Sequence, residues 1–123
     1  MLEKEICIRF VKTLKEIQHL STKPFVWFHV VNEFDTRRNA YSHNFNLAKM
    51  GRISGVADYI FLWDNGNLAL EFKVPKGKQN EAQKLFELRC ISASIPYRIA
   101  HSVEEAYAIL EAVGLFEKGK IIL

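Results

Sequence analysis

Two apolar segments joined by a short polar turn constrain the fold of this chain more than any other feature. Residues 56–63 and 68–74 are rich in aromatic and branched side chains, and Asp64-Asn65-Gly66-Asn67 lies between them. An Asn-Gly pair favours a two-residue hairpin turn because both turn positions take positive φ. We therefore predict an antiparallel hairpin with Asn65-Gly66 as its turn.

Three charged residues interrupt these apolar segments, namely Asp58, Glu71 and Lys73. In the predicted register residue 64 pairs with residue 67, so Asp58 lies opposite Lys73. Side chains alternate between the faces of a sheet, so the three charged groups share one face, roughly 5–8 Å apart. Two carboxylates this close repel each other unless a cation lies between them, and Mg²⁺ favours such ligands together with water. The alternative is a plain salt bridge between an acid and Lys73.

The rest of the chain predicts a mixed α/β domain. We expect a helix over 2–20, a strand buried on both faces over 25–31, an irregular loop over 32–54, a helix over 80–94, a strand over 97–100 and a helix from Ser102 to Gly114. With the hairpin, the order is αβββαβα, a mixed sheet flanked by helices in a single domain of residues 1–123. His29 lies among apolar strand residues, and we interpret it as a core or supporting histidine.

Composition excludes several classes of protein. The chain has 123 residues, of which 49% are hydrophobic and 25% charged, as in an ordinary soluble domain. Its apolar stretches are too short to cross a bilayer, and the first residues, MLEKEICIRF, do not resemble a signal peptide. Cys7 and Cys90 lie in helical segments, so we expect small core residues without a disulfide. The lack of a secretion signal favours the cytoplasm, and so minimal a domain would suit a bacterial or phage origin.

The net charge of +3 is unevenly distributed along the chain. Residues 36–57 contain no Asp or Glu, but they contain the basic residues Arg37, Arg38, His43, Lys49 and Arg52. Lys76 and Lys78 follow the hairpin. Such side chains attract phosphates and predict contact with DNA, whereas the alternative is a solvated loop with incidental charge. We interpret Tyr41 and Phe45 as anchors of this loop rather than as platforms for bases.

A combination of motifs runs through the chain: GRISGVAD at 51–58, LEFK at 70–73, then Gly77-Lys78 and Gln83, with Asn32-Glu33 before them and YRIAHSVEE at 97–105 after them. This combination resembles the VRR-NUC branch of the PD-(D/E)XK nuclease superfamily over residues 3–114. The resemblance implies a restriction-endonuclease-like core and a metal-dependent nuclease.

The resemblance also implies roles for individual residues. Asp58 and Glu71 would bind Mg²⁺, for which Mn²⁺ can substitute, and the backbone carbonyl of Phe72 would be a third ligand. Lys73 would orient or activate the attacking water, and Gln83 would support the site. A glutamate on the first helix is also expected. We assign Glu3 to this role, with Glu5 and Glu33 as alternatives, and Cys7 stands where family members often have glutamine.

The sequence therefore predicts a Mg²⁺-dependent endonuclease that hydrolyses DNA phosphodiester bonds. Small single-domain members resemble Holliday-junction resolvases, which implies a homodimer and a preference for four-way or flapped DNA. Apolar residues at 115–116 and 121–123 are the spare surface for such a dimer. One alternative is a catalytically silent DNA-binding module on the same fold, against which the intact Asp58, Glu71 and Lys73 count. The other is an interaction protein in which the hairpin charges only pair with each other.

Overall fold

The computed structural model describes residues 2–31 and 41–123 and has a mixed α/β fold, as predicted. Its elements are α1 (Glu3–Ile17), the 3-10 turn η1 (Gln18–Leu20), β1 (Phe25–His29), α2 (Tyr41–Lys49), β2 (Tyr59–Trp63), β3 (Gly66–Phe72), α3 (Glu81–Ser92), β4 (Tyr97–Ala100) and α4 (Val103–Ala112). The strands form one sheet in the order β1-β2-β3-β4, in which only β3 and β4 are parallel. No helix in the described residues is long and apolar enough to cross a membrane.

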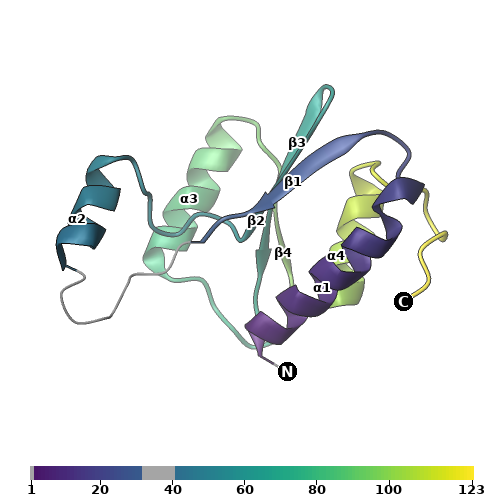
Figure 1. The fold of residues 1–123 in the computed structure, drawn as a ribbon, viewed down its shortest axis with the longest axis horizontal. Helices are drawn as coiled ribbons and strands as arrows, with labels where there is room; N and C mark the ends of the chain where they lie inside the picture. Colours follow the sequence, from purple (N-terminus) through teal and green to yellow (C-terminus); the bar gives the residue numbers. More distant parts are fainter. Residues whose placement is uncertain (1, 32–40) are drawn as a thin grey trace.

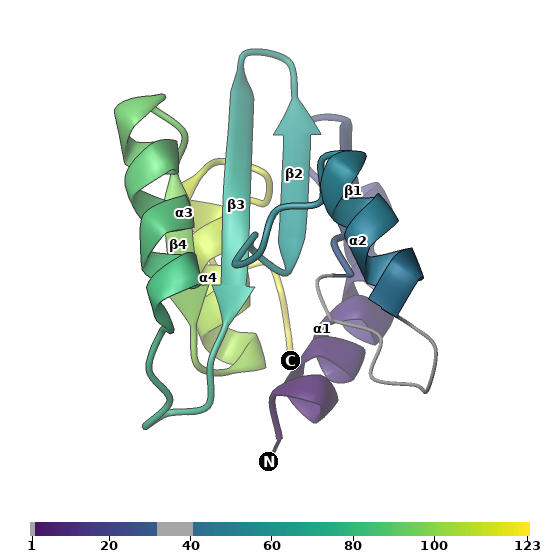
Figure 2. The same cartoon turned by 90° about the vertical axis from the view of Figure 1, so that its left-hand side faces the viewer.

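The helices cover the two faces of the sheet unequally. Figure 1 shows α1 and α4 together on one face and α3 on the other, with α2 farther out on the side of α3. Seen from that side, α3 lies in front of β4, β3 and β2 are in full view beside it, and α2 lies in front of β1 (Figure 2). The face that carries α3 is therefore only partly covered.

The main core lies between the sheet and the helices α1 and α4. Apolar residues four positions apart, Ile6, Phe10 and Leu14, form the buried side of α1. The ring of Phe10 contacts Phe72 and Tyr107, each at 5.1 Å between ring centroids. The hydroxyl of Tyr107 also donates to the Phe10 carbonyl at 2.8 Å, so α1 and α4 are joined across the core. This packing gives β2 and β3 a rigid support.

The hairpin forms as predicted, but the predicted register is wrong. The turn residues are Asp64 and Asn65, so Trp63 pairs with Gly66 and Tyr59 with Leu70. Asn65 takes the left-handed conformation with φ of 62°, whereas Gly66 begins β3 beneath the indole of Trp63, which a Cβ at Gly66 would overlap. The glycine is needed for this close approach rather than for the turn.

Two further predictions about the first half of the chain are wrong. The segment 32–54 was expected to be a loop, yet Tyr41–Lys49 is a helix that buries no residue, and 32–40 lie outside the described residues. The order thus gains a helix between β1 and β2. The strand β1 was expected to be buried on both faces, yet Val26 and Phe28 are 61% and 48% exposed. Both side chains lie on an edge strand that α3 does not cover.

Candidate active site

Asp58 and Glu71 come together at one end of the central hairpin. One step beyond the last ladder pair, Tyr59 with Leu70, Asp58 faces Glu71 rather than the predicted Lys73. The Asp58 Oδ2 accepts a hydrogen bond from the Phe72 N–H at 2.8 Å, and its carbonyl accepts one from the Val30 N–H at 2.8 Å. Strands β1 and β3 therefore hold Asp58 from both sides. The corrected register brings the two acids closer than the predicted one.

Glu71 is a buried acid, with only 2% of its surface exposed. Burial is the largest cause that raises its pKa to about 9; the hydrogen bond and the charge of Asp58 act in the same direction, and Lys73 acts in the opposite one. In the part of the chain that the structure describes, Glu71 Oε2 is a buried oxygen with no hydrogen-bond partner. A buried polar atom without a partner is costly, so this oxygen is suited to bind a cation or a donor.

Both acids face a cavity of about 500 Å³, which we call the acidic cavity. Its other walls are residues 29–31, residues 54–56 and the first turn of α3. Gln83 lines it as predicted from the motif, with its Oε1 accepting from the Asn80 N–H at 2.9 Å. The Asn80 Oδ1 in turn accepts from the Gln83 N–H at 2.9 Å, so the start of α3 is fixed by a reciprocal cap.

Gly55 holds the segment 54–56 against α3. Its φ is +82°, and a Cβ at this position would overlap the backbone of Ala82 and Gln83. Only glycine combines this conformation with so close an approach to a helix. Gly55 is therefore the residue that allows this wall of the acidic cavity to form.

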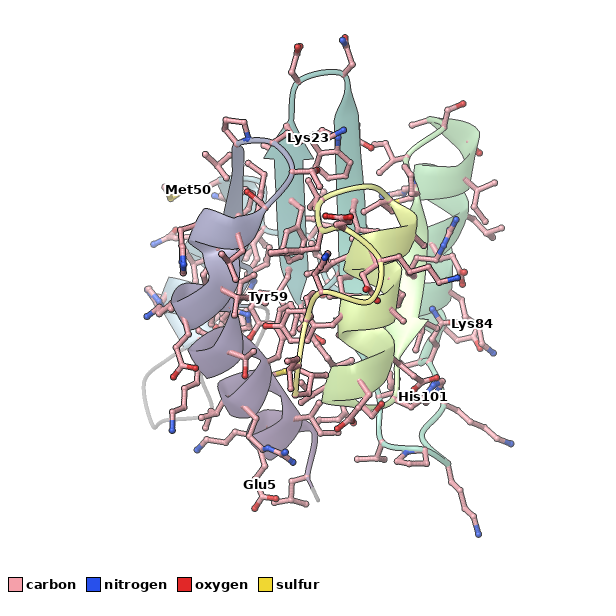
Figure 3. All side chains as sticks on the ribbon, turned by 90° about the vertical axis from the view of Figure 1, so that its right-hand side faces the viewer. Glu5, Lys23, Met50, Tyr59, Lys84 and His101 are labelled. Carbon is pink, nitrogen blue, oxygen red and sulfur yellow. The ribbon has the colours of Figure 1, made fainter. Side chains whose placement is uncertain are left out.

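The candidate glutamates differ in their surroundings. Glu3 lines a second cavity together with Asp58, and its charge contributes to the raised pKa of Glu71. Glu5 instead accepts from the Leu2 N–H at 3.2 Å, and Figure 3 shows it extending away from the protein at the start of α1. Glu33 lies outside the described residues. Of the two described glutamates, Glu3 is the one that lines a cavity together with Asp58.

Lys73 and Phe72 follow Glu71 at the end of β3. The backbone N–H of the half-buried Lys73 donates to the Ala100 carbonyl at 3.0 Å, and the charge of Lys73 acts to lower the pKa of Glu71. The ring of Phe72 is fully buried in the main core. In residues 2–31 and 41–123, no three His, Cys, Asp or Glu side chains are grouped to hold a metal. The side chains of this site would supply two carboxylates, and water would complete the shell of a hard cation.

His29 is a site residue that the sequence interpretation placed either in the core or in a supporting role. Its ring is exposed rather than in the core, and it borders both the acidic cavity and the second cavity. The Nδ1 atom lies 2.9 Å from the Asp58 carbonyl oxygen, and the ring lies 4.9 Å from that of Tyr59. The available signal was its position at the end of the first strand, next to the segment that carries the motif.

The predicted DNA-binding residues lie in separate places. His43 and Lys49 are exposed on α2, and the half-buried Arg52 donates to the Asn44 side chain at 3.3 Å. Lys76 and Lys78 are exposed between β3 and α3, on the other side of β2 and β3 from α2 (Figure 2). Arg37 and Arg38 lie outside the described residues.

Tyr41 and Phe45 do not anchor this region, contrary to the prediction. They are 81% and 50% exposed and stack on each other, with an angle of 6° between the rings. The Lys49 ammonium lies 4.5 Å above the Phe45 ring. This surface of α2 presents aromatic and basic groups to solvent.

No protein-family model matches this chain, and no curated protein or solved structure is significantly similar to it. What the site can do therefore follows from its own geometry. A carboxylate pair, of which Glu71 is buried, and a capped helix start line one open cavity, and the charge of Lys73 acts on Glu71. Such a set can bind a divalent cation together with an anionic ligand.

Proposed function

We propose that this chain is a Mg²⁺-dependent endonuclease of the VRR-NUC type, with a restriction-endonuclease-like core, that hydrolyses DNA phosphodiester bonds in the cytoplasm. The observation that carries the proposal is the pair of Asp58 and Glu71, which both line an open cavity and in which Glu71 Oε2 is buried without a hydrogen-bond partner among the described residues. Their position at the ends of β2 and β3 in a mixed sheet and the neighbouring Lys73 also support it. Mn²⁺ would serve in place of Mg²⁺.

Asp58 and Glu71 would hold the cation, with the Phe72 carbonyl as a third protein ligand. Mg²⁺ held there would supply a Lewis acid for the phosphoryl oxygen and would lower the pKa of bound water. Lys73 orients the attacking water and donates to the charge that develops on the phosphoryl oxygens. Gln83 supports the cavity wall, and Glu3 adds negative charge on the α1 side of Asp58.

The buried position of Glu71 couples cation binding to proton release. Without a cation, its pKa of about 9 keeps Glu71 protonated near neutral pH. A carboxylate must be deprotonated to serve as a metal ligand. Uptake of Mg²⁺ at neutral pH therefore releases the proton of Glu71.

The nucleic acid would contact the basic residues on both sides of the cavity. These are His43, Lys49 and Arg52 near α2, Lys76 and Lys78 before α3, and the predicted Arg37 and Arg38. The acidic cavity lies at the end of β2 and β3, between α2 and the connection to α3. A strand that crosses the cavity would approach both basic groups.

We extend the proposal to a homodimer that acts on four-way or flapped DNA. The expected dimer surface needs correction, because Leu115 and Phe116 are buried in the main core. The face of β1 and β2 that α3 does not cover supports a dimer better, since Val26, Phe28 and Leu62 are exposed there. Sedimentation equilibrium of the wild type and of Phe28→Asp tests this part, with a shift of the variant toward monomer expected.

The nuclease proposal is tested by incubating the purified protein with labelled linear, flapped and four-way DNA. Each substrate is offered with Mg²⁺, with Mn²⁺ or with a chelator. We expect cutting only with a metal, and its loss in Lys73→Ala. The proposal fails if neither metal supports cutting of any substrate, or if Lys73→Ala cuts as well as the wild type. DNA that is bound but never cut would identify the catalytically silent module instead.

A further inference from the structure

A second cavity, of about 590 Å³, lies on the α1 side of Asp58. The helix α1 contributes Cys7, Ile8 and Val11 to its walls, and the sheet contributes Trp27 and Tyr59. We call it the apolar cavity, because these residues form most of its lining. Figure 3 shows Tyr59 in the layer between α1 and α4, behind the helices and against the sheet.

The polar ends of the two aromatic side chains in this cavity are already engaged. The indole N–H of Trp27 donates to Gln18 Oε1 at 3.0 Å. The Tyr59 hydroxyl donates to the sulfur of Cys7, whose pKa burial raises to about 11. The interior therefore presents mostly carbon surface, and the charged groups among the described lining residues are Glu3, Lys4 and Asp58. A phosphate or a second metal ion would find few ligands inside.

The apolar cavity and the acidic cavity share two residues, Asp58 and His29. The His29 ring is held in place by the Asp58 carbonyl, 2.9 Å from Nδ1, and by contact with the Tyr59 ring. Consider a ligand whose phosphate lies at Asp58 in the acidic cavity. The group attached to that phosphate can then extend past the His29 ring into the apolar cavity. A flat aromatic group with a polar edge fits such walls and such a rim.

We propose that the apolar cavity takes the base of an unpaired nucleotide next to the phosphodiester that is cleaved. This assignment rests on the proposed nuclease function and specifies its substrate class. A base in an intact duplex is stacked and paired, so it must leave the helix before it can enter a protein cavity. The substrate therefore offers an unpaired nucleotide beside the cleaved bond, as single strands, flaps and branch points do.

Base binding is measured without any cleavage step, by the fluorescence of Trp27. The chain has two tryptophans, and Trp63 lies at the far end of the hairpin, so Trp63→Phe leaves Trp27 as the sole reporter. The probes are 2′-deoxyadenosine 5′-monophosphate and 2-deoxyribose 5-phosphate, which lacks the base, each titrated with Mg²⁺ and with a chelator. We expect saturable quenching by the nucleotide and about tenfold weaker binding of the sugar phosphate.

A matched pair of variants tests the location. Ile8 and Ile91 are 59% and 60% exposed on α1 and α3, and only Ile8 lines the apolar cavity. In the Trp63→Phe protein, Ile8→Phe fills part of the cavity and should weaken nucleotide binding about tenfold, whereas Ile91→Phe should leave it unchanged. Equal binding of the two probes, or equal effects of the two variants, overturns the assignment.

Cleavage of matched single-stranded and duplex oligonucleotides separates this inference from the nuclease proposal. We expect the single strand to be cut faster, and Ile8→Phe to raise KM for it more than it lowers kcat. Nucleotide binding with the expected preference but no cutting of any DNA supports the base site and overturns the nuclease. Equal cutting of single strand and duplex without nucleotide binding overturns the base site and leaves the nuclease standing.

Discussion

The acid pair and the helix α2 serve the same proposed site but are held by the protein in very different ways. Asp58 and Glu71 are attached to the central strands, and Asp58 accepts hydrogen bonds from the backbone of Val30, just after β1, and of Phe72 in β3. The helix α2 buries no residue, and its aromatic side chains contact each other rather than the core. The first region fixes reacting groups, and the second offers exposed charge.

This difference has an energetic consequence. A buried carboxylate without a full set of partners destabilises the fold until a ligand satisfies it. An exposed lysine costs the fold almost nothing, and it acts on a charged ligand through screened electrostatics. Substitutions in the acid pair should therefore change both activity and stability strongly, whereas those on α2 should change binding modestly.

The largest effect is expected from Asp58→Asn. This change removes the charge of a proposed metal ligand but keeps an oxygen that can accept from the Phe72 N–H. Loss of several kcal/mol of transition-state stabilisation lowers the cleavage rate at least about 10³-fold. The rate is measured in single turnover with Mg²⁺. Asp64→Asn, in the exposed turn of the same hairpin, is the control and should cut like the wild type. A rate for Asp58→Asn within about tenfold of the control would exclude the carboxylate as a ligand.

The second prediction concerns the stability of the metal-free protein. Its cause is the pKa of Glu71, which rises from an ordinary 4.5 to about 9. The stabilisation from this bound proton is complete below about pH 4.5 and is lost as the pH rises toward about 9. One fully linked proton changes the free energy of unfolding by about 1.4 kcal/mol per pH unit. Urea unfolding with a chelator should therefore show a stability that falls between pH 6 and pH 8.5.

Glu71→Gln imitates the protonated acid and should remove most of this slope. Glu81→Gln, whose side chain is almost fully exposed, should keep it. Addition of Mg²⁺ at pH 8.5 should stabilise the wild type and the Glu81→Gln variant but not the Glu71→Gln variant. A slope that survives in Glu71→Gln would show that another group binds the proton.

The third prediction concerns Gly55, which lies in the segment that connects α2 to Asp58. Gly55 and Gly119 have the same φ of +82°, but a Cβ would meet the backbone of α3 only at Gly55 and has open space at Gly119. Gly119→Ala should cost about 1–2 kcal/mol for the left-handed backbone alone. Gly55→Ala should cost about 1–3 kcal/mol more, since the wall of the acidic cavity must move. Equal losses in thermal unfolding would mean that the contact with α3 adds nothing.

The sequence was sufficient to predict which side chains share a face of the sheet, because side chains alternate between the two faces along a strand. Asp58 and Glu71 lie on one face because the side-chain period of a strand is two, and a register error of two residues leaves the face unchanged. The turn was misplaced because Gly66 has a second use, the close contact with Trp63, which is not visible in the local sequence.

The sequence could not predict how exposed a helix or strand is, because exposure depends on which other elements pack against it. The helix α2 has no buried side, so it lacks the apolar period by which helices are recognised. The apolar residues of β1 predicted burial on both faces, but only the sheet order shows that this strand is an edge. The same edge position leaves His29 exposed between two cavities, so the core role, one of the two predicted for it, is wrong.

The smallest effect is expected from Lys49→Ala on α2. One phosphate contact fewer should weaken DNA binding roughly fivefold near 0.1 M salt and lower the slope of log K against log salt by about 1. Fluorescence anisotropy with labelled DNA measures both, in the Asp58→Asn protein so that the DNA stays intact. Lys118→Ala removes the same charge beyond α4, far along the chain from α2, and should change neither. If both variants weaken binding equally, the protein attracts DNA through its net charge of +3 alone, and α2 is not part of the interface.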